Sequence, residues 1–422
     1  MPPQTAPPPE PVHRTGPSPL PLHLGLSNLI WLSWPLLWQR LQPKSPTLKP
    51  SSMRQDWSQS LQQRAAKLAA QSAKLPPERW LVALAAEGLK RQRAYLAGVK
   101  LYRRQALVAT SAPPLLLQQI GTTKLLDFAP QLQHRPALLV IPSLINSARI
   151  LDLSPERSFL RWLVQQNIRP LLIDWDMPRA DEAGFSVSDY SVRLQQFLPM
   201  LRQRSPSPIH IFGHCLGGNL ALALCALAPQ QFRSLTLCST PWDFHAGDPT
   251  LGQQAKALWQ KIAAQKNQAG LIPASLLQSL FALLQPMAVT DKFRRLSIHP
   301  PSTVELQHFT RVEDWLNDGV PVTRKVLEEI VRDWYGRNLP VSGGWRVGTT
   351  HVRPRNINLP TLIAIPEQDH IVPPASSAAL ARQLPCARLL PVPLGHIGMI
   401  VSRRAESRFW QPFAAWVNDY SQ

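Results

Sequence analysis

The feature that most constrains this chain is a series of short, largely continuous apolar runs between residues 137 and 392. Because these runs do not alternate with polar residues, they suit strands buried on both faces of a parallel sheet. Helical patterns lie between the runs, and this alternation predicts a mostly parallel, doubly wound α/β sheet. One helix is expected to begin at Ser154, Pro155 and Glu156, which offer an N-cap and an acidic first turn. The predicted strands are 137–141, 170–174, 209–212, 235–239, 361–365 and 388–392.

Composition divides the rest of the chain. Proline is abundant, with 44 residues against 19 glycines, and 13 of the prolines lie in residues 1–50. We therefore expect a Pro-rich, flexible extension over 1–52 and a basic helical region over 53–121, broken at Pro76 and Pro77. The α/β domain then covers 122–422. Between about 245 and 339 the alternation gives way to helical, proline-punctuated sequence, which predicts a cap or lid insertion.

The net charge bears on which molecules the protein binds, and the cysteines bear on metal sites and on the cellular compartment. The net charge is +19, which suits an anionic partner, but the basic residues are scattered and no groove-reading motif accompanies them, so we expect no nucleic-acid binding. The four cysteines lack metal-ligand spacing, which predicts no metal site and free thiols in the cytoplasm. No apolar run reaches the length of a membrane span. The apolar stretch 26–38 either lies on an apolar surface or packs on its own domain.

The sharpest local motif is Gly213-His214-Cys215-Leu216-Gly217, set between a predicted strand and an Ala/Leu-rich helix. It has the pattern of a nucleophile elbow, G-x-S-x-G, with cysteine in the serine position. The turn is so tight that side chains at positions 213 and 217 would collide with neighbouring elements, so both positions require glycine, Gly213 and Gly217. The alternative is a buried cysteine in a glycine-rich turn, but the strand before and the helix after favour the elbow. At the helix N-terminus, a thiolate is stabilised and the Leu216 N–H is placed for an oxyanion hole.

An elbow of this kind requires an acid and then a histidine later in the chain, each just past a strand. Asp369 follows the strand 361–365, and His396 follows the strand 388–392. We expect Asp369 to orient His396, which deprotonates Cys215 or an incoming hydroxyl. Glu367 is the rival acid. His370 is the rival base, but its place beside the acid suits a supporting role around the triad better.

A second oxyanion donor should come from the loop after the strand 137–141. That loop contains Leu144, Ile145 and Asn146, with Leu144 and Ile145 as the candidates for the donor.

At these residues the chain resembles the polyhydroxyalkanoate (PHA) synthases, polyester polymerases of bacterial storage granules, from about residue 98 to 420. The motifs follow in the order that this family shows, which is highly specific for the α/β-hydrolase superfamily. The core looks closest to the class III catalytic subunits, with an atypical N-terminal extension. The matching segments are Ile141–Asn146, Gly213–Gly218, Thr240–Phe244, Asp369–Pro373 and Gly395–Gly398.

The resemblance implies an α/β-hydrolase fold with Cys215 as the acylated nucleophile, His396 as base and Asp369 as its partner. It implies a hydroxyacyl-coenzyme A (CoA) thioester as substrate and a growing polyester chain as product, with no cofactor. It also implies a cytoplasmic protein associated with PHA granules, acting as a homodimer or with a second synthase subunit.

Two other functions remain open at this stage. One is a hydrolase using the same triad, namely a thioesterase, an esterase or a polyester depolymerase. The other is a non-catalytic, granule-associated protein on a hydrolase fold. The cysteine at the elbow and the cap motifs argue against an ordinary serine esterase, and the intact triad argues against a scaffold.

Overall fold

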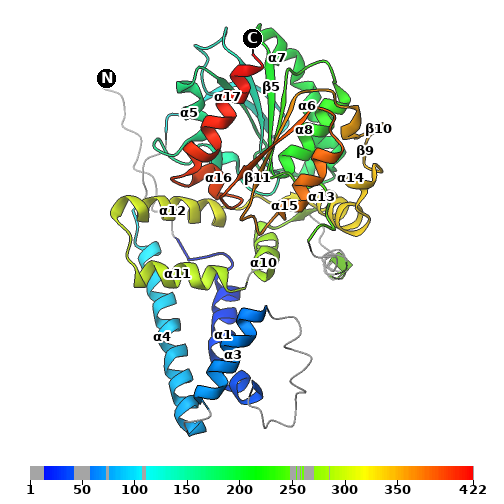
Figure 1. Ribbon diagram of the computed structural model, residues 1–422. Helices are drawn as coiled ribbons and strands as arrows, with labels where there is room; N and C mark the ends of the chain where they lie inside the picture. Colours follow the sequence, from blue (N-terminus) through cyan, green and yellow to red (C-terminus); the bar gives the residue numbers. More distant parts are fainter. Residues whose placement is uncertain are drawn as a thin grey trace, which may run out of the picture. The chain divides into compact units, whose positions relative to one another are not determined.

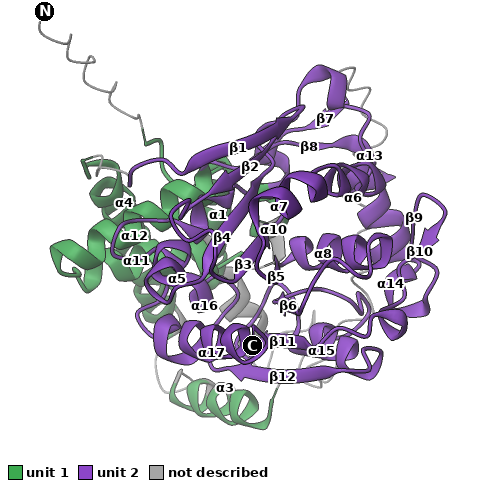
Figure 2. Ribbon diagram, turned by 90° about the horizontal axis from the view of Figure 1, so that it is seen from above, with its two compact units in different colours: residues 1–108, 278–317 green, residues 109–277, 318–422 purple. Residues whose placement is uncertain are grey.

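The computed structural model describes residues 14–41, 58–72, 76–106, 111–247, 253, 257, 259–260, 270–284 and 286–421. The chain divides into two compact units, coloured separately in Figure 2. Unit 1 consists of residues 1–108 and 278–317, and unit 2 consists of residues 109–277 and 318–422. The middle of the expected cap, 278–317, therefore groups with the N-terminal helices rather than with the α/β domain.

Unit 2 is built on a sheet with the strand order β1-β2-β4-β3-β5-β6-β11-β12, eight strands within the described residues. From β4 to β12 all neighbours are parallel, whereas β1 pairs with β2, and β2 with β4, in antiparallel fashion. The mostly parallel α/β fold predicted from the apolar runs is thus confirmed, and each predicted strand is present. The strands are β1 (Leu115–Ile120), β2 (Thr123–Asp127), β3 (Ala137–Ile141), β4 (Arg169–Asp174), β5 (Ile209–His214), β6 (Leu235–Cys238), β11 (Thr361–Pro366) and β12 (Ala387–Val392).

The hairpin β1–β2 is absent from the sequence prediction. Its turn is Gly121 and Thr122, with Gly121 at φ +59°, a conformation that glycine adopts without penalty. The turn is held by Glu182, whose carboxylate accepts hydrogen bonds from the N–H and the hydroxyl of Thr122. Arg193 pairs with the same carboxylate at 2.7 Å, so a buried ion pair fixes the edge of the sheet.

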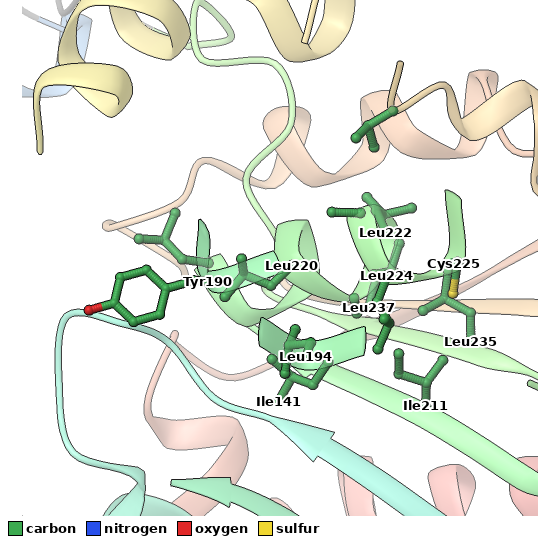
Figure 3. Close-up of a cluster of buried hydrophobic side chains, with 14 of the residues drawn as sticks. Ile141, Tyr190, Leu194, Ile211, Leu220, Leu222, Leu224, Cys225, Leu235 and Leu237 are labelled. Carbon is green, nitrogen blue, oxygen red and sulfur yellow. The ribbon is translucent and has the colours of Figure 1, made fainter. Parts of the chain in front are cut away.

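Helices cover both faces of this sheet, with α5 and α17 on one face and α6, α8 and α15 on the other (Figures 1 and 2). On the first face Phe159 of α5, Phe212 of β5 and Phe413 of α17 lie within 5.6 Å of one another, measured between ring centroids. Around α8 the second face is largely aliphatic, and Figure 3 shows α8 residues such as Leu220 and Leu224 beside β5 and β6. The helices are α5 (Phe159–Gln165), α6 (Val187–Gln196), α7 (Leu198–Arg204), α8 (Leu216–Leu227), α15 (Pro374–Ala378), α16 (Gly398–Val401) and α17 (Gln411–Asp419).

The helix expected to begin at Ser154 begins later, so that part of the prediction is wrong. Residues Ser154 to Arg157 form a turn, closed by a hydrogen bond from the Arg157 N–H to the Ser154 carbonyl. The N-cap is Ser158, whose hydroxyl accepts from the Arg161 N–H at 2.9 Å. A second serine four residues on therefore supplies the cap, and Phe159 and Leu163 of α5 are buried.

Several short elements of unit 2 connect the sheet with the region around its carboxyl edge. Two strand pairs, β7 with β8 and β9 with β10, are each only two residues long. The pair β7–β8 shows that the predicted helical insertion also contains strand pairing, whereas β9–β10 lies after the insertion. The elements are η1 (Ala148–Leu151), η2 (Ala180–Glu182), β7 (Leu271–Ile272), β8 (Val322–Thr323), α13 (Arg324–Glu329), η3 (Ile330–Gly336), α14 (Leu339–Ser342), β9 (Arg346–Val347), β10 (Thr350–His351), η4 (Pro354–Asn356), η5 (Ala379–Arg382) and η6 (Glu406–Trp410).

Unit 1 joins N-terminal helices with helices of the insertion. Gly98 of α4 lies so close to α11 that an added Cβ would stand 1.9 Å from the Phe293 carbonyl oxygen. Arg14 forms a bidentate ion pair with Asp314, both contacts at 2.7 Å, and the Tyr102 hydroxyl donates to the same carboxylate. The helices are α1 (Leu20–Leu41), α3 (Gln59–Ser72), α4 (Pro77–Arg103), α11 (Ala288–Ile298) and α12 (Thr303–Asn317), and α10 (Ala274–Leu284) precedes α11.

The predictions for the N-terminal region agree with the structure only in part. The break expected at Pro76 and Pro77 separates α3 from α4. Residues 14–41 belong to the extension predicted to be flexible, yet they contain α1 and the buried Arg14. The remainder of 1–52, namely 1–13 and 42–52, lies outside the described residues. Among the described helices, none combines the length and apolar character needed to cross a bilayer.

Candidate active site

Cys215 stands at a sharp turn between β5 and α8. Its backbone is at φ 54° and ψ −126°, a conformation that an L-residue rarely adopts and that costs of order 1–3 kcal/mol. The surroundings fix it, because its N–H donates to the Cys238 carbonyl at 2.9 Å and its own carbonyl accepts from the Gly218 N–H. The strand, strained residue and helix together have the geometry of a nucleophile elbow.

The glycines of the motif are required by close backbone approach. A Cβ on Gly213 would lie 2.4 Å from the Gly218 Cα, and one on Gly217 would lie 2.0 Å from the Ile141 carbonyl oxygen. Both distances are far inside van der Waals contact, so no side chain fits at either position. Gly213 and Gly217 therefore act through the backbone, by letting α8 approach β5 and the end of β3.

Asp369 and His396 meet as the sequence predicts. His396 Nδ1 lies 2.6 Å from Asp369 Oδ2, and both side chains are buried. The other carboxylate oxygen, Oδ1, accepts from the N–H groups of Ile371 and Val372 at 2.8 and 2.9 Å. The loop after β11 thus holds the carboxylate in a fixed orientation, which in turn fixes the imidazole.

The rival residues Glu367 and His370 lie on the same loop, and both are exposed. The buried partner of His396 is Asp369. The structure places His370 at the surface beside Asp369, so any supporting role of its side chain stays a prediction.

The electrostatics of the site favour a charged His396. Burial alone would lower the pKa of His396, but the negative charge of Cys215 and the hydrogen bonds with Asp369 and Cys215 raise it to about 10. His396 is therefore protonated near neutral pH, beside the sulfur of Cys215. A protonated imidazole favours the thiolate form of a neighbouring cysteine, which is the nucleophilic form.

The two candidates for the second oxyanion donor differ in their surroundings. The Ile145 N–H donates to the Ser143 hydroxyl at 3.3 Å, whereas the Leu144 N–H has no hydrogen-bond partner among the described residues. The loop itself is held by Trp175, whose indole N–H donates to the Pro142 carbonyl at 3.1 Å. The Leu144 N–H is thus free to serve as a donor with that of Leu216, which begins α8, and the assignment of the second donor stays a prediction.

A small pocket opens beside Leu144. Its lining is largely apolar and comes from the ends of β4 and β8 and from α6 and α13. The lining residues include Trp175, Tyr190, Pro321, Val322 and Val326.

Two sulfur atoms near the triad, those of Cys238 and Met399, make contacts that the sequence does not predict. Met399 is buried three residues after His396, and its sulfur accepts from the Ser239 hydroxyl at 3.0 Å and the Cys238 thiol at 3.4 Å. Ser239 itself has a positive φ of 51°. These contacts connect the end of β6 to the segment that bears His396, and no local sequence pattern predicts them.

Tyr335, in the predicted insertion, lies near enough to Cys215 to feel its charge. It lies in η3, a π-helix, and its ring meets Phe244 edge-on at a centroid distance of 5.0 Å. Burial raises the pKa of the Tyr335 hydroxyl to about 12, with a further contribution from the negative charge of Cys215. Asn338 holds the neighbouring loop by accepting from the Phe244 N–H and donating to Asp243.

Among the described residues, no group of three or more His, Cys, Asp or Glu side chains is arranged to hold a metal ion. The structure thus offers no ligand set for a metal within that part of the chain.

The fold and the order of the site residues agree with the comparison to known families. The model of the α/β hydrolase fold family matches residues 174–402, a span that contains Cys215, Asp369 and His396. The chain belongs to this family.

Within that fold, the chain is related to poly(3-hydroxyalkanoate) polymerase subunits named PhaC, and the predicted resemblance is confirmed. It is 27% identical to the Haloferax mediterranei protein over 295 residues, which is 69% of this chain and 60% of that protein. It is 28% identical to the Allochromatium vinosum protein over 296 residues, covering 69% and 82% of the two chains. The matched region thus spans only about 60% of the haloarchaeal relatives, which include the Haloarcula marismortui protein.

Solved structures of similar fold include a monoacylglycerol lipase from Paleococcus ferrophilus. It is 15% identical, with a TM-score of 0.46, and the match covers 71% of this chain and 99% of the lipase. The putative non-heme bromoperoxidase BpoC from Mycobacterium tuberculosis is 18% identical, with a TM-score of 0.43 and coverage of 71% and 98%.

Proposed function

We propose that this chain is a PHA synthase-like acyltransferase that polymerises (R)-3-hydroxyacyl-CoA into polyester with release of CoA. The observation that carries the proposal is the buried Asp369–His396 pair beside a cysteine on a nucleophile elbow. The curated relatives are named as polymerase subunits, which supports an enzyme of this class.

In the first step, the Cys215 thiolate attacks the thioester carbonyl carbon. The new S–C bond forms as the bond to CoA breaks, and the CoA thiolate takes the proton of the His396 imidazolium. The developing oxyanion would be stabilised by hydrogen bonds from the N–H groups of Leu216 and Leu144. One thioester replaces another, so the acyl group keeps its activation.

In the second step, the neutral His396 removes the proton from the 3-hydroxyl of an incoming unit or chain end. The resulting alkoxide attacks the acyl-cysteine, forms an ester bond and releases the Cys215 thiolate, which restores the ion pair. Asp369 stabilises the imidazolium that forms and holds its ring in place. Water must be excluded during this step, because it would hydrolyse the acyl-enzyme.

Coenzyme A is the only small molecule that this chemistry requires, as part of the substrate rather than as a resident cofactor. We further propose a cytoplasmic location on the surface of PHA granules, and assembly as a homodimer or with a second synthase subunit. The class III-like core supports the second subunit, and the basic helical region 53–121 supports an anionic partner or surface.

The deciding experiment is incubation of the full chain, alone and with candidate partner subunits, with 3-hydroxybutyryl-CoA. Polymer together with free CoA is the expected result. Free hydroxy acid with CoA release would instead make the protein a hydrolase with the same triad. No CoA release under any condition would favour a non-catalytic, granule-associated protein.

A further inference from the structure

A second imidazole lies against the candidate base. The rings of His214 and His396 are 5.6 Å apart between centroids and inclined by 44°. His214 is the last residue of β5, directly before Cys215, and only 3% of its surface is exposed. The triad as described above gives this histidine no role.

The position of His214 follows from the alternation of side chains along a strand. His210, Phe212 and His214 share the face of β5 that is covered by α17, because residues two apart point the same way. The ionisable groups around His214 come from four segments: Cys215 next to it, Cys238 opposite it on β6, and His396 with its partner Asp369. His214 therefore sits among the groups that carry the charge of the site.

His214 also carries an unsatisfied nitrogen. Its Nε2 is fully buried and has no hydrogen-bond partner among the described residues. An unpaired buried polar atom is unfavourable, because it has lost its hydrogen bonds to water without replacing them. A phenylalanine would fill the same space without this cost, so packing alone does not account for histidine at this position.

The two imidazoles differ in charge. Burial, and then the charge of His396, lowers the pKa of His214 to about 3, whereas His396 is held protonated. A neutral imidazole thus faces an imidazolium. The lone pair and dipole of a neutral ring can stabilise a neighbouring cation in a site of low dielectric, which a second charged ring could not do.

We propose that His214 is a positioning residue for His396: its neutral ring holds the His396 imidazolium toward Cys215 and stabilises the thiolate–imidazolium pair. The proposal deepens the proposed function, because it rests on the assigned roles of Cys215 and His396. It assigns no contact of His214 with the substrate.

The test is the rate of alkylation of Cys215 by iodoacetamide as a function of pH, because only the thiolate reacts. The reaction is measured on the full chain carrying Cys386→Ser, which removes the exposed cysteine, and the modified peptide is identified by mass spectrometry. The variants are His214→Phe and His214→Gln. The matched control is His210→Phe, a second buried histidine on the same strand that bonds Ser234 and Ser421 instead.

In His214→Phe we expect the alkylation rate at pH 6 to fall by about 3- to 10-fold, while the rate at pH 10 stays unchanged. The melting temperature should stay equal or rise, since the unpaired nitrogen is gone. His210→Phe should lower the melting temperature and leave the pH profile in place. His214→Gln serves if His214→Phe does not fold, with a smaller shift in the same direction.

A pH profile equal to that of the parent chain in the folded His214 variants would overturn the proposal and leave His214 as a packing residue. The assay needs no CoA substrate. A protein that shows the expected alkylation profile but makes no polymer would therefore contradict the proposed function and not the role of His214.

Discussion

His396 Nδ1 lies 2.6 Å from Asp369 Oδ2, and this contact joins the loops that follow two neighbouring parallel strands, β12 and β11. Because parallel strands end at the same edge of a sheet, 27 residues of separation in sequence become one hydrogen bond. The same edge carries Cys215 after β5. The sheet topology therefore assembles the site, and the loops only set its final geometry.

Replacement of Asp369 by asparagine should lower the turnover number by about 10²- to 10⁴-fold, because an amide cannot stabilise the imidazolium. Glu367→Gln, which changes the exposed rival acid on the same loop, should leave turnover within about twofold. CoA release from 3-hydroxybutyryl-CoA measures both. A larger loss in Glu367→Gln than in Asp369→Asn would assign the acid to Glu367.

The raised pKa of His396 predicts the pH dependence of stability. In the unfolded chain histidine titrates near 6.5, whereas folding raises the pKa of His396 to about 10. The stabilisation from its charge is therefore fully present below about pH 6.5 and is lost as the pH rises through about 10. Urea unfolding between pH 7 and 10.5 should show a loss in the parent chain that His396→Gln lacks. Parallel curves for the two proteins would speak against the ion pair.

The lowered pKa of His210 predicts a loss of stability at acidic pH, in contrast to the loss at alkaline pH expected from His396. Burial, with the charge of Arg233 adding to it, lowers its pKa to about 4, and its ring bonds Ser234 and Ser421. The unfolded state therefore takes up the proton first, so stability present above about pH 6.5 is lost as the pH falls through about 4, by about 3 kcal/mol. His210→Gln should flatten this part of the urea-unfolding profile. An unchanged slope in the variant would mean that other groups cause the acid loss.

The close contact at Gly98 predicts that a larger residue there destabilises unit 1. Gly98→Ala places a methyl group 1.9 Å from the Phe293 carbonyl oxygen, so α4 and α11 must move apart at a cost of about 1–3 kcal/mol or more. Gly25→Ala in α1 is the matched control, since nothing lies within 4 Å of its Cβ position, and it should be neutral or slightly stabilising. Thermal unfolding compares them, and an equal response to both changes would refute the close α4–α11 contact.

Much of the site could be predicted because its signals are local. The strands of the parallel sheet are continuous apolar runs, and the elbow is a five-residue pattern whose glycines have a steric reason. Asp369 and His396 were found because each follows a strand, although the choice against Glu367 required knowledge of burial.

The features that sequence reasoning missed depend on contacts between distant segments. The hairpin β1–β2 is partly exposed and fixed by Glu182, about 60 residues away. Residues 278–317 group with the N-terminal helices because α11 approaches the backbone of α4 closely at Gly98, and because Arg14 pairs with Asp314. The place of His214 beside His396 depends on the sheet register, although its position inside the elbow motif was visible from the start.

The most direct test of the central claim is covalent labelling of Cys215 by substrate. The full chain is mixed with 3-hydroxybutyryl-CoA, quenched in acid and digested, and the peptides are analysed by mass spectrometry. Our account predicts a hydroxybutyryl group on Cys215 in the parent chain and in Cys225→Ala, a control at a buried cysteine of α8, and none in Cys215→Ala. Labelling that survives in Cys215→Ala, or that maps to another residue, would contradict the account.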